Sequence, residues 1–197
     1  GTWYMNEKRE FQQAAFSNNP LRINLFTGDP KTLPGAIRQN PVFTTTLCAA
    51  AKTRWVIQGP KHRNDTLGIE LTLSEKGWKP RREPDKNTVL ILGNEGDTAA
   101  VLVICGPAWD TTQEYANELK KTCDIPENVG TLKERKCQIA GRQGIRLDFQ
   151  RKVNDRLISF TCYCLVLEDR AFQFFATSAP GHEKEIEKVI QGFRLIK

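Results

Sequence analysis

Apolar and polar residues alternate along much of this chain in a way that predicts β-strands. Leucine or isoleucine occupies every second position over residues 67–73, which is the period of a half-buried strand. Further strands are expected over 88–92 and over 98–105, where an almost continuous apolar run suits a central strand covered on both faces. Turn residues at 93–97 predict that the last two form a hairpin.

The same alternation returns in the last third of the chain and predicts an antiparallel meander. Residues 137–140 lead through a glycine-containing turn into 145–149, where apolar and polar residues alternate strictly. Longer strands are expected over 157–167 and 171–177, and short polar turns separate them.

Two helices are predicted beside these strands. Asp110 is a natural N-cap, and Gln113 can complete a capping box, for a helix over 111–121. Pro180 opens a second helix. Its apolar residues recur at i, i+3, i+4 and i+7, as Ile186, Val189, Ile190 and Phe193. Because this stripe must be buried against the sheet, the expected fold class is α+β.

The first 60 residues follow no single pattern. Residues 11–15 suggest a short helix, 21–25 alternate as a strand, and 44–58 could supply one or two strands more. Glycine and proline interrupt this segment repeatedly. We therefore expect residues 1–60 to be an irregular extension packed on a main domain of residues 61–197.

Charge adds a candidate binding face. The 197 residues contain 29 Lys and Arg against 23 Asp and Glu, a formal net charge of +6. Several basic residues gather on the predicted meander, namely Arg142, Arg146, Arg151, Lys152 and Arg156. They could dock an acidic surface of a protein partner, and the alternative is a nucleic-acid-binding face. An ordinary solvated sheet surface would carry the same charges without any partner.

No catalytic motif stands out, so we expect neither an enzyme nor a cofactor. The sequence has no Gly-x-Ser-x-Gly elbow, phosphate-binding loop or His-Glu-x-x-His helix. Cys162 and Cys164 share one strand face, but the surroundings favour core packing over a metal site. A hydrolase that pairs one of these thiols with His62 or His182 remains an alternative.

The cysteines carry a second prediction. Four of the six lie in apolar, strand-like surroundings and are expected in the core: Cys48, Cys105, Cys162 and Cys164. Cys123 and Cys137 instead flank a loop-like stretch and are the expected disulfide pair in an oxidising compartment.

Residues 66–197 resemble a known family in the order of their elements. A strand precedes Gly77-Trp78, and two strands, a helix and a meander follow. Ser178-Ala179-Pro180 then opens a terminal helix that ends at Gly192-Phe193. This arrangement is similar to the PsbP family, whose fold is shared with the Ran-binding nuclear import factor and with DcrB-type bacterial envelope proteins.

The resemblance implies an antiparallel sheet flanked by helices, a PsbP-type αβα sandwich, that binds protein partners rather than catalysing a reaction. The first residues have no signal-peptide character, and the longest apolar run, 99–105, is too short to cross a membrane. A chain that begins with Gly1, and a glycosylation-type sequon at Asn64, favour a processed protein outside the cytoplasm. A cytoplasmic protein is the alternative.

Overall fold

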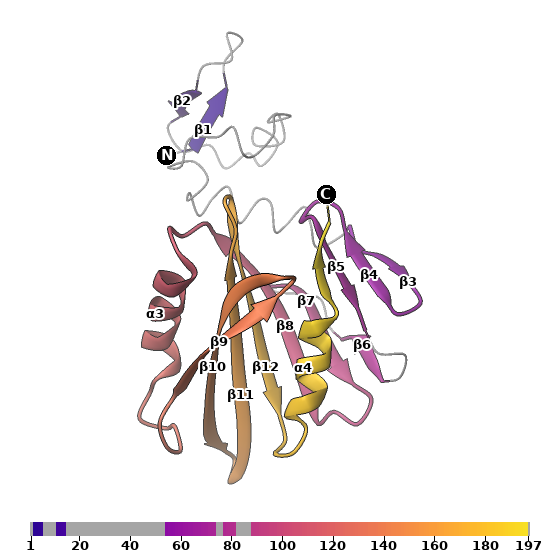
Figure 1. Ribbon diagram of the computed structural model, residues 1–197, viewed down its shortest axis with the longest axis vertical. Coiled ribbons are helices and arrows are strands. Elements are labelled where there is room, and N and C mark those ends of the chain that lie inside the picture. Colours follow the sequence, from indigo (N-terminus) through magenta and orange to yellow (C-terminus); the bar gives the residue numbers. More distant parts are fainter. Residues whose placement is uncertain (1, 6–10, 15–53, 74–76, 82–87, 197) are drawn as a thin grey trace.

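A computed structural model describes residues 2–5, 11–14, 54–73, 77–81 and 88–196 (Figure 1). Its main feature is a seven-stranded antiparallel sheet in the order β6-β7-β8-β12-β11-β10-β9. The strands are β6 (Trp78–Pro80), β7 (Thr88–Asn94), β8 (Ala99–Pro107), β9 (Lys133–Ile139), β10 (Arg142–Val153), β11 (Arg156–Val166) and β12 (Arg170–Ser178). The predicted β7–β8 hairpin and the β9-to-β12 meander are both confirmed.

A second, four-stranded antiparallel sheet has the order β13-β5-β4-β3. It consists of β3 (Val56–Gln58), β4 (Lys61–Asn64), β5 (Ile69–Thr72) and β13 (Phe193–Leu195). His62 lies on β4 and is 4% exposed. Since β3 pairs with β4, residues 56–58, at the end of the expected 1–60 extension, are part of this sheet.

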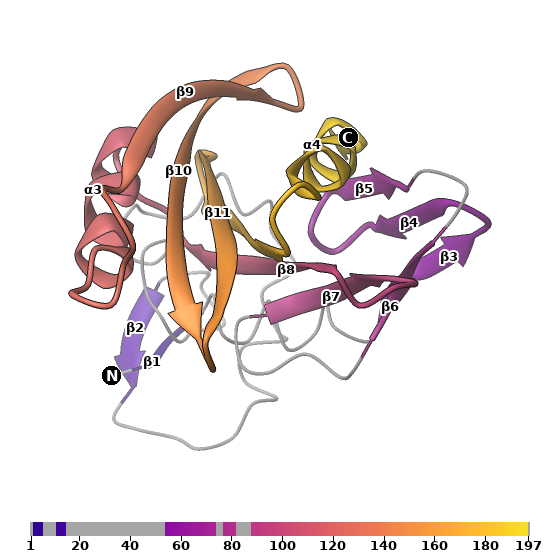
Figure 2. The same ribbon diagram turned by 90° about the horizontal axis from the view of Figure 1, so that it is seen from below.

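The helices α3 (Thr112–Cys123) and α4 (Glu183–Gln191) lie on opposite faces of the large sheet (Figure 2). The N-cap of α3 is Thr111 and not the predicted Asp110, because Thr111 Oγ1 accepts a hydrogen bond from the Glu114 amide at 3.1 Å. The two helices and the antiparallel sheet between them confirm the expected α+β class.

Alternation along the central strands divides the core into two clusters. Tyr163 and Leu165 of β11 join the cluster that packs under α4, whereas Cys162 and Cys164 join the cluster that packs under α3. The α4 cluster also contains the inner residues of the small sheet, so α4 and that sheet cover the same face. The predicted apolar stripe of α4 is confirmed, because Ile186, Val189 and Ile190 are all buried.

Gly192 fixes how α4 passes into the small sheet. A Cβ atom at this position would collide with the carbonyl oxygen of Thr72 on β5. The close approach lets the Thr72 amide donate to the Gly192 carbonyl oxygen at 2.9 Å and places Phe193 beside Leu71. Phe193 then packs edge-on against Phe174 of β12, with ring centroids 4.7 Å apart.

Near the amino terminus, β1 (Thr2–Met5) and β2 (Phe11–Ala14) form an antiparallel pair. The helix expected around residues 11–15 is therefore wrong over 11–14, where pairing between strands satisfies backbone groups that so short a helix would leave open. The strand expected over 21–25 and most of the 44–58 segment lie outside the described residues.

Candidate functional site

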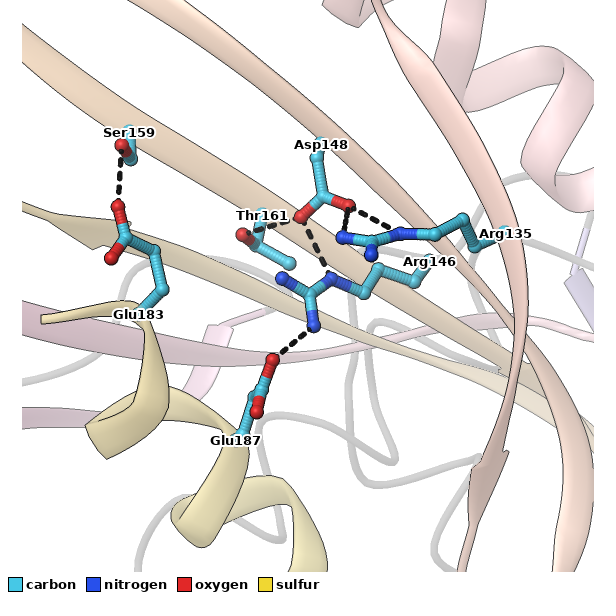
Figure 3. Close-up of polar contacts among 7 residues, drawn as sticks. All are labelled: Arg135, Arg146, Asp148, Ser159, Thr161, Glu183 and Glu187. Atoms are coloured by element: carbon cyan, nitrogen blue, oxygen red, sulfur yellow. Dashed lines mark hydrogen bonds and ion pairs between the residues drawn. The ribbon is translucent and has the colours of Figure 1, made fainter. Parts of the chain in front are cut away.

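A cavity of about 500 Å³ lies on the α4 face of the large sheet. Its polar walls come from Lys133 and Arg135 on β9, Arg146 and Asp148 on β10, Ser159 and Thr161 on β11, and Glu183 at the start of α4. Figure 3 shows most of these side chains, which point from the three neighbouring strands and the helix toward one another. The side-chain alternation of the strands puts them on this face.

Asp148 is the hub of the cavity wall. Its Oδ2 accepts hydrogen bonds from Arg135 Nη2 at 2.5 Å and from Arg135 Nε at 3.2 Å. Its Oδ1 accepts from Arg146 Nε at 2.7 Å and from Thr161 Oγ1 at 3.0 Å. Because both oxygens are occupied by donors of the same chain, this carboxylate is held in one orientation.

Arg146 links the hub to α4. Its side chain is only 13% exposed, and Nη1 donates to Glu187 Oε1 at 2.6 Å. The guanidinium also lies over the ring of Tyr163, 5.2 Å from its centroid. Burial by itself would lower the pKa of Arg146, but the hydrogen bonds to Glu187 and Asp148 raise it above its usual value, so the group stays charged.

The other wall is anchored through the first turn of α4. Glu183 Oε1 accepts from Ser159 Oγ at 3.0 Å, and Glu183 Oε2 accepts from the Gly181 amide at 3.0 Å. Farther round the helix, Glu185 Oε2 accepts from Asn94 Nδ2 on β7 at 2.9 Å. Hydrogen bonds from His182 and Asn94 lower the pKa of Glu185. Polar contacts therefore tie α4 to several strands, in addition to its apolar stripe.

The structure does not bring the five basic residues singled out from the sequence onto one face. Arg142, Arg146 and Lys152 fall on the α4 face of the hairpin, whereas Arg151 and Arg156 fall on the other face. Arg146 is neutralised by two carboxylates, as described above.

Arg151 also has a structural role. It donates to the Cys123 carbonyl oxygen and to Asn128 Oδ1, each at 2.8 Å, and it stacks on Phe149. This distribution gives no specific support to nucleic-acid binding, which needs a continuous basic surface.

The structure also corrects the expected disulfide. Cys123 and Cys137 are both free thiols. Cys123 ends α3 and faces Cys162, whereas Cys137 packs with the cluster under α4. The sheet separates the two sulfurs, and burial raises the pKa of each thiol to about 11.

The remaining thiols and the imidazoles lie apart in the fold. Cys105, Cys162 and Cys164 are buried, as predicted, while Cys48 lies outside the described residues. Cys162 and Cys164 face α3, whereas His182 immediately precedes α4 on the other face of the sheet. His62 lies in the small sheet. The arrangement therefore offers no support for a thiol and imidazole pair.

The described residues provide neither a candidate metal site nor a candidate membrane-spanning helix. Within these ranges, no group of three or more His, Cys, Asp or Glu side chains is placed to hold a metal ion. In the same parts of the chain, no helix has the length and apolar character that a membrane crossing requires.

Sequence reasoning missed most of the residues that define the cavity. Arg146 was singled out for its charge, but Arg135, Asp148, Glu183 and Glu187 were not identified as its neighbours. Arg146 and Asp148 are two positions apart on an alternating strand, so their shared face could have been read from the sequence. Nothing local in the sequence indicates that Glu187, 41 positions after Arg146, completes the group.

Comparison with known proteins shows a fold but no family. No family model matches the sequence, and no curated protein matches it. A solved structure from Bacteroides thetaiotaomicron is 15% identical with a TM-score of 0.53, and the similarity covers 72% of this chain and 50% of that one. This chain therefore spans half the length of that protein.

Two other similar structures belong to named proteins. The cyanobacterial PsbP, CyanoP, from Synechocystis sp. PCC 6803 is 12% identical with a TM-score of 0.53, and the similarity covers 71% of this chain and 95% of CyanoP. LpqN, involved in cell envelope biogenesis of Mycobacterium tuberculosis, is 13% identical with a TM-score of 0.50, covering 66% of this chain and 83% of LpqN. The chain thus has a PsbP-like fold, as its element order predicted.

Proposed function

We propose that this chain is a non-catalytic protein-interaction domain that works outside the cytoplasm and binds its partner at the cavity beside α4. The observation that carries the proposal is the contrast between the hydrogen-bonded walls of the cavity and its exposed cationic rim, which consists of Lys133 and Arg135. Ser159 and Thr161 are buried and hydrogen-bonded, whereas Lys133 is exposed and Arg135 keeps 59% of its side chain exposed. A rigid wall with charged groups at its edge suits recognition of another molecule.

The chemistry of the cavity favours binding over catalysis. A general base at Asp148 would have to give up hydrogen bonds to two arginines before it could take a proton. The thiols of Cys123 and Cys137 have raised pKa values, so little of the reactive thiolate exists at neutral pH.

The compartment is proposed on two grounds. LpqN, which shares the fold, is involved in cell envelope biogenesis. The thiols of Cys105, Cys162 and Cys164 are buried, which would protect them from oxidation in an oxidising compartment. Fractionation of the tagged full-length protein in its source organism tests this part, and recovery in the cytoplasm would contradict it.

The binding role is tested by comparative affinity selection with the full chain and two variants. Lys133→Glu/Arg135→Glu reverses the rim charges, and Lys152→Glu, at an exposed position on the same sheet, is the matched control. We expect a protein that is retained by the wild type and by Lys152→Glu to be lost from the rim variant. Equal retention by all three proteins, or retention of nucleic acid in place of protein, would overturn the proposal.

A further inference from the structure

We propose that the cavity receives a carboxylate group from an acidic segment of the partner, and that Arg135, Arg146 and Lys133 supply the hydrogen-bond donors. This inference rests on the proposed function and names the chemistry that the site recognises. It follows from a count of the hydrogen-bonding groups in the cavity wall.

The main acceptors of the cavity wall already take part in hydrogen bonds within the chain. Asp148 accepts four hydrogen bonds from its own chain. Glu183 accepts one hydrogen bond on each oxygen, from Ser159 and from Gly181. Ser159 Oγ accepts from Gln150 Nε2 at 3.2 Å while it donates to Glu183. A ligand that offers only donors would therefore find Asp148, the central carboxylate of the wall, already filled.

The donors are in surplus. A guanidinium carries five N–H groups, and Arg135 uses Nε and Nη2 on Asp148 while Arg146 uses Nε on Asp148 and Nη1 on Glu187. Among the described residues, Arg135 Nη1 and Arg146 Nη2 have no hydrogen-bond acceptor; Figure 3 shows a nitrogen of each guanidinium without a contact. Lys133, which also lines the cavity, is exposed.

A carboxylate is the anion that the unmodified side chains of a protein partner would offer to this surplus of donors. The planar fork of a guanidinium matches a carboxylate, and such charge-assisted hydrogen bonds are among the stronger ones in proteins. Asp148 and Glu183 also line the cavity, so its charged lining has only a small excess of positive charge. A volume of about 500 Å³ is large enough for the side chains of a short peptide.

The test is a titration of the isotope-labelled full chain with a blocked hexapeptide of alternating Asp and Glu, followed by NMR. We expect shifts at Lys133, Arg135 and Arg146 that saturate, and affinity that falls as salt rises from about 50 to about 500 mM. The matched peptide of Asn and Gln, inorganic phosphate and anionic vesicles are the comparison ligands. Shifts mapping elsewhere, or equal or stronger binding of any comparison ligand, would overturn the proposal.

Variants sharpen the test. Arg135→Gln removes an exposed guanidinium, and we expect it to weaken peptide binding by about tenfold or more. Lys152→Gln removes an exposed cation on β10 that does not line the cavity, so it should leave the affinity for the peptide unchanged. Thermal unfolding confirms that each variant is folded. Unchanged affinity in a folded Arg135→Gln variant would contradict the assignment.

The two proposals can fail separately. If a partner is lost from the rim variant but the acidic peptide does not bind, the interaction role stands and the carboxylate assignment falls. If the peptide binds at these residues but no rim-dependent partner is selected, the recognition chemistry stands and the proposed function falls.

Discussion

Arg146 Nη1 lies 2.6 Å from Glu187 Oε1, and this ion pair joins β10 to α4 across the edge of the cavity. Arg146 is largely buried, whereas Glu187 is 43% exposed. Removing Arg146 should therefore lower the free energy of unfolding by more than removing Glu187 does.

We expect Arg146→Ala to lower the free energy of unfolding by about 2–4 kcal/mol, because it leaves the largely buried Asp148 without one of its cations. Glu187→Gln should cost less than about 1 kcal/mol, since Arg146 keeps its bond to Asp148 and the carbonyl oxygen of the substituted amide can still accept from Nη1. Denaturant unfolding of both variants measures the difference. Equal losses would show that Asp148 does not depend on Arg146.

Gly192→Ala tests the passage from α4 into β13. The new methyl group would meet the Thr72 carbonyl oxygen, which is backbone and cannot rotate away. We expect a loss of about 1–3 kcal/mol. Gly181→Ala is a less suitable control, because Gly181 has a positive φ that alanine disfavours. The control is Lys188→Ala, on the exposed side of α4, which should change the free energy of unfolding by less than about 0.5 kcal/mol. If Gly192→Ala does not lower stability, the chain at residue 192 can move away from β5, which would contradict the close approach described here.

His62 makes stability depend on pH. Burial lowers its pKa below the usual value of 6.5, and its Nδ1 has no hydrogen-bond partner among the described residues. Above pH 6.5 both the folded and the unfolded states hold it neutral. As the pH falls below that value, the unfolded state binds the proton first, so stability declines until the lower folded pKa is reached.

The melting temperature of the wild type should therefore fall between about pH 7.5 and 5.5 by more than that of His62→Gln. Glu185 and Glu134, whose pKa values are lowered by hydrogen bonds from His182 and Lys120 respectively, contribute only at lower pH, below about 4.5. Parallel pH profiles for wild type and variant would show that His62 is not held neutral by the fold.

The free thiols predict a defined labelling pattern. In denaturant without reductant, Cys123 and Cys137 should both react with a maleimide or iodoacetamide reagent, as mapped by peptide mass spectrometry. In the native protein Cys137, which is only partly buried, should react before Cys162 and Cys164. Its rate should rise about tenfold per pH unit toward its pKa of about 11. If Cys123 and Cys137 do not react in denaturant, they form a disulfide after all.

The alternating strands and the stripe of α4 could be predicted from the sequence because each buries one face along a regular period. The β3–β4 hairpin could not, since the buried positions of β4 are His62 and Asn64, which look like loop residues. Only the apolar end of the edge strand β9 could be predicted, since the rest of this strand is charged and shows no alternation of apolar and polar residues. Charge on an edge strand is common because it discourages pairing with other chains.

The cavity could not be predicted from local sequence patterns. Its walls combine β9, β10, β11 and α4, and the pairing register alone decides that Arg135 lies opposite Arg146. A count of basic residues selected Arg146 but gave no sign that Asp148 and Glu187 neutralise it. Which cations remain available to a ligand is set by these distant partners.

Reversal of the rim charge is the most direct test of the central claim, that this cavity recognises carboxylates. Side-by-side titrations would compare the wild type and Arg135→Glu with the acidic hexapeptide and with a lysine hexapeptide of the same length. We expect the wild type to prefer the acidic peptide and the variant to lose that preference or invert it, while Lys152→Glu behaves like the wild type. The same preference in the wild type and in a folded Arg135→Glu variant would contradict the account.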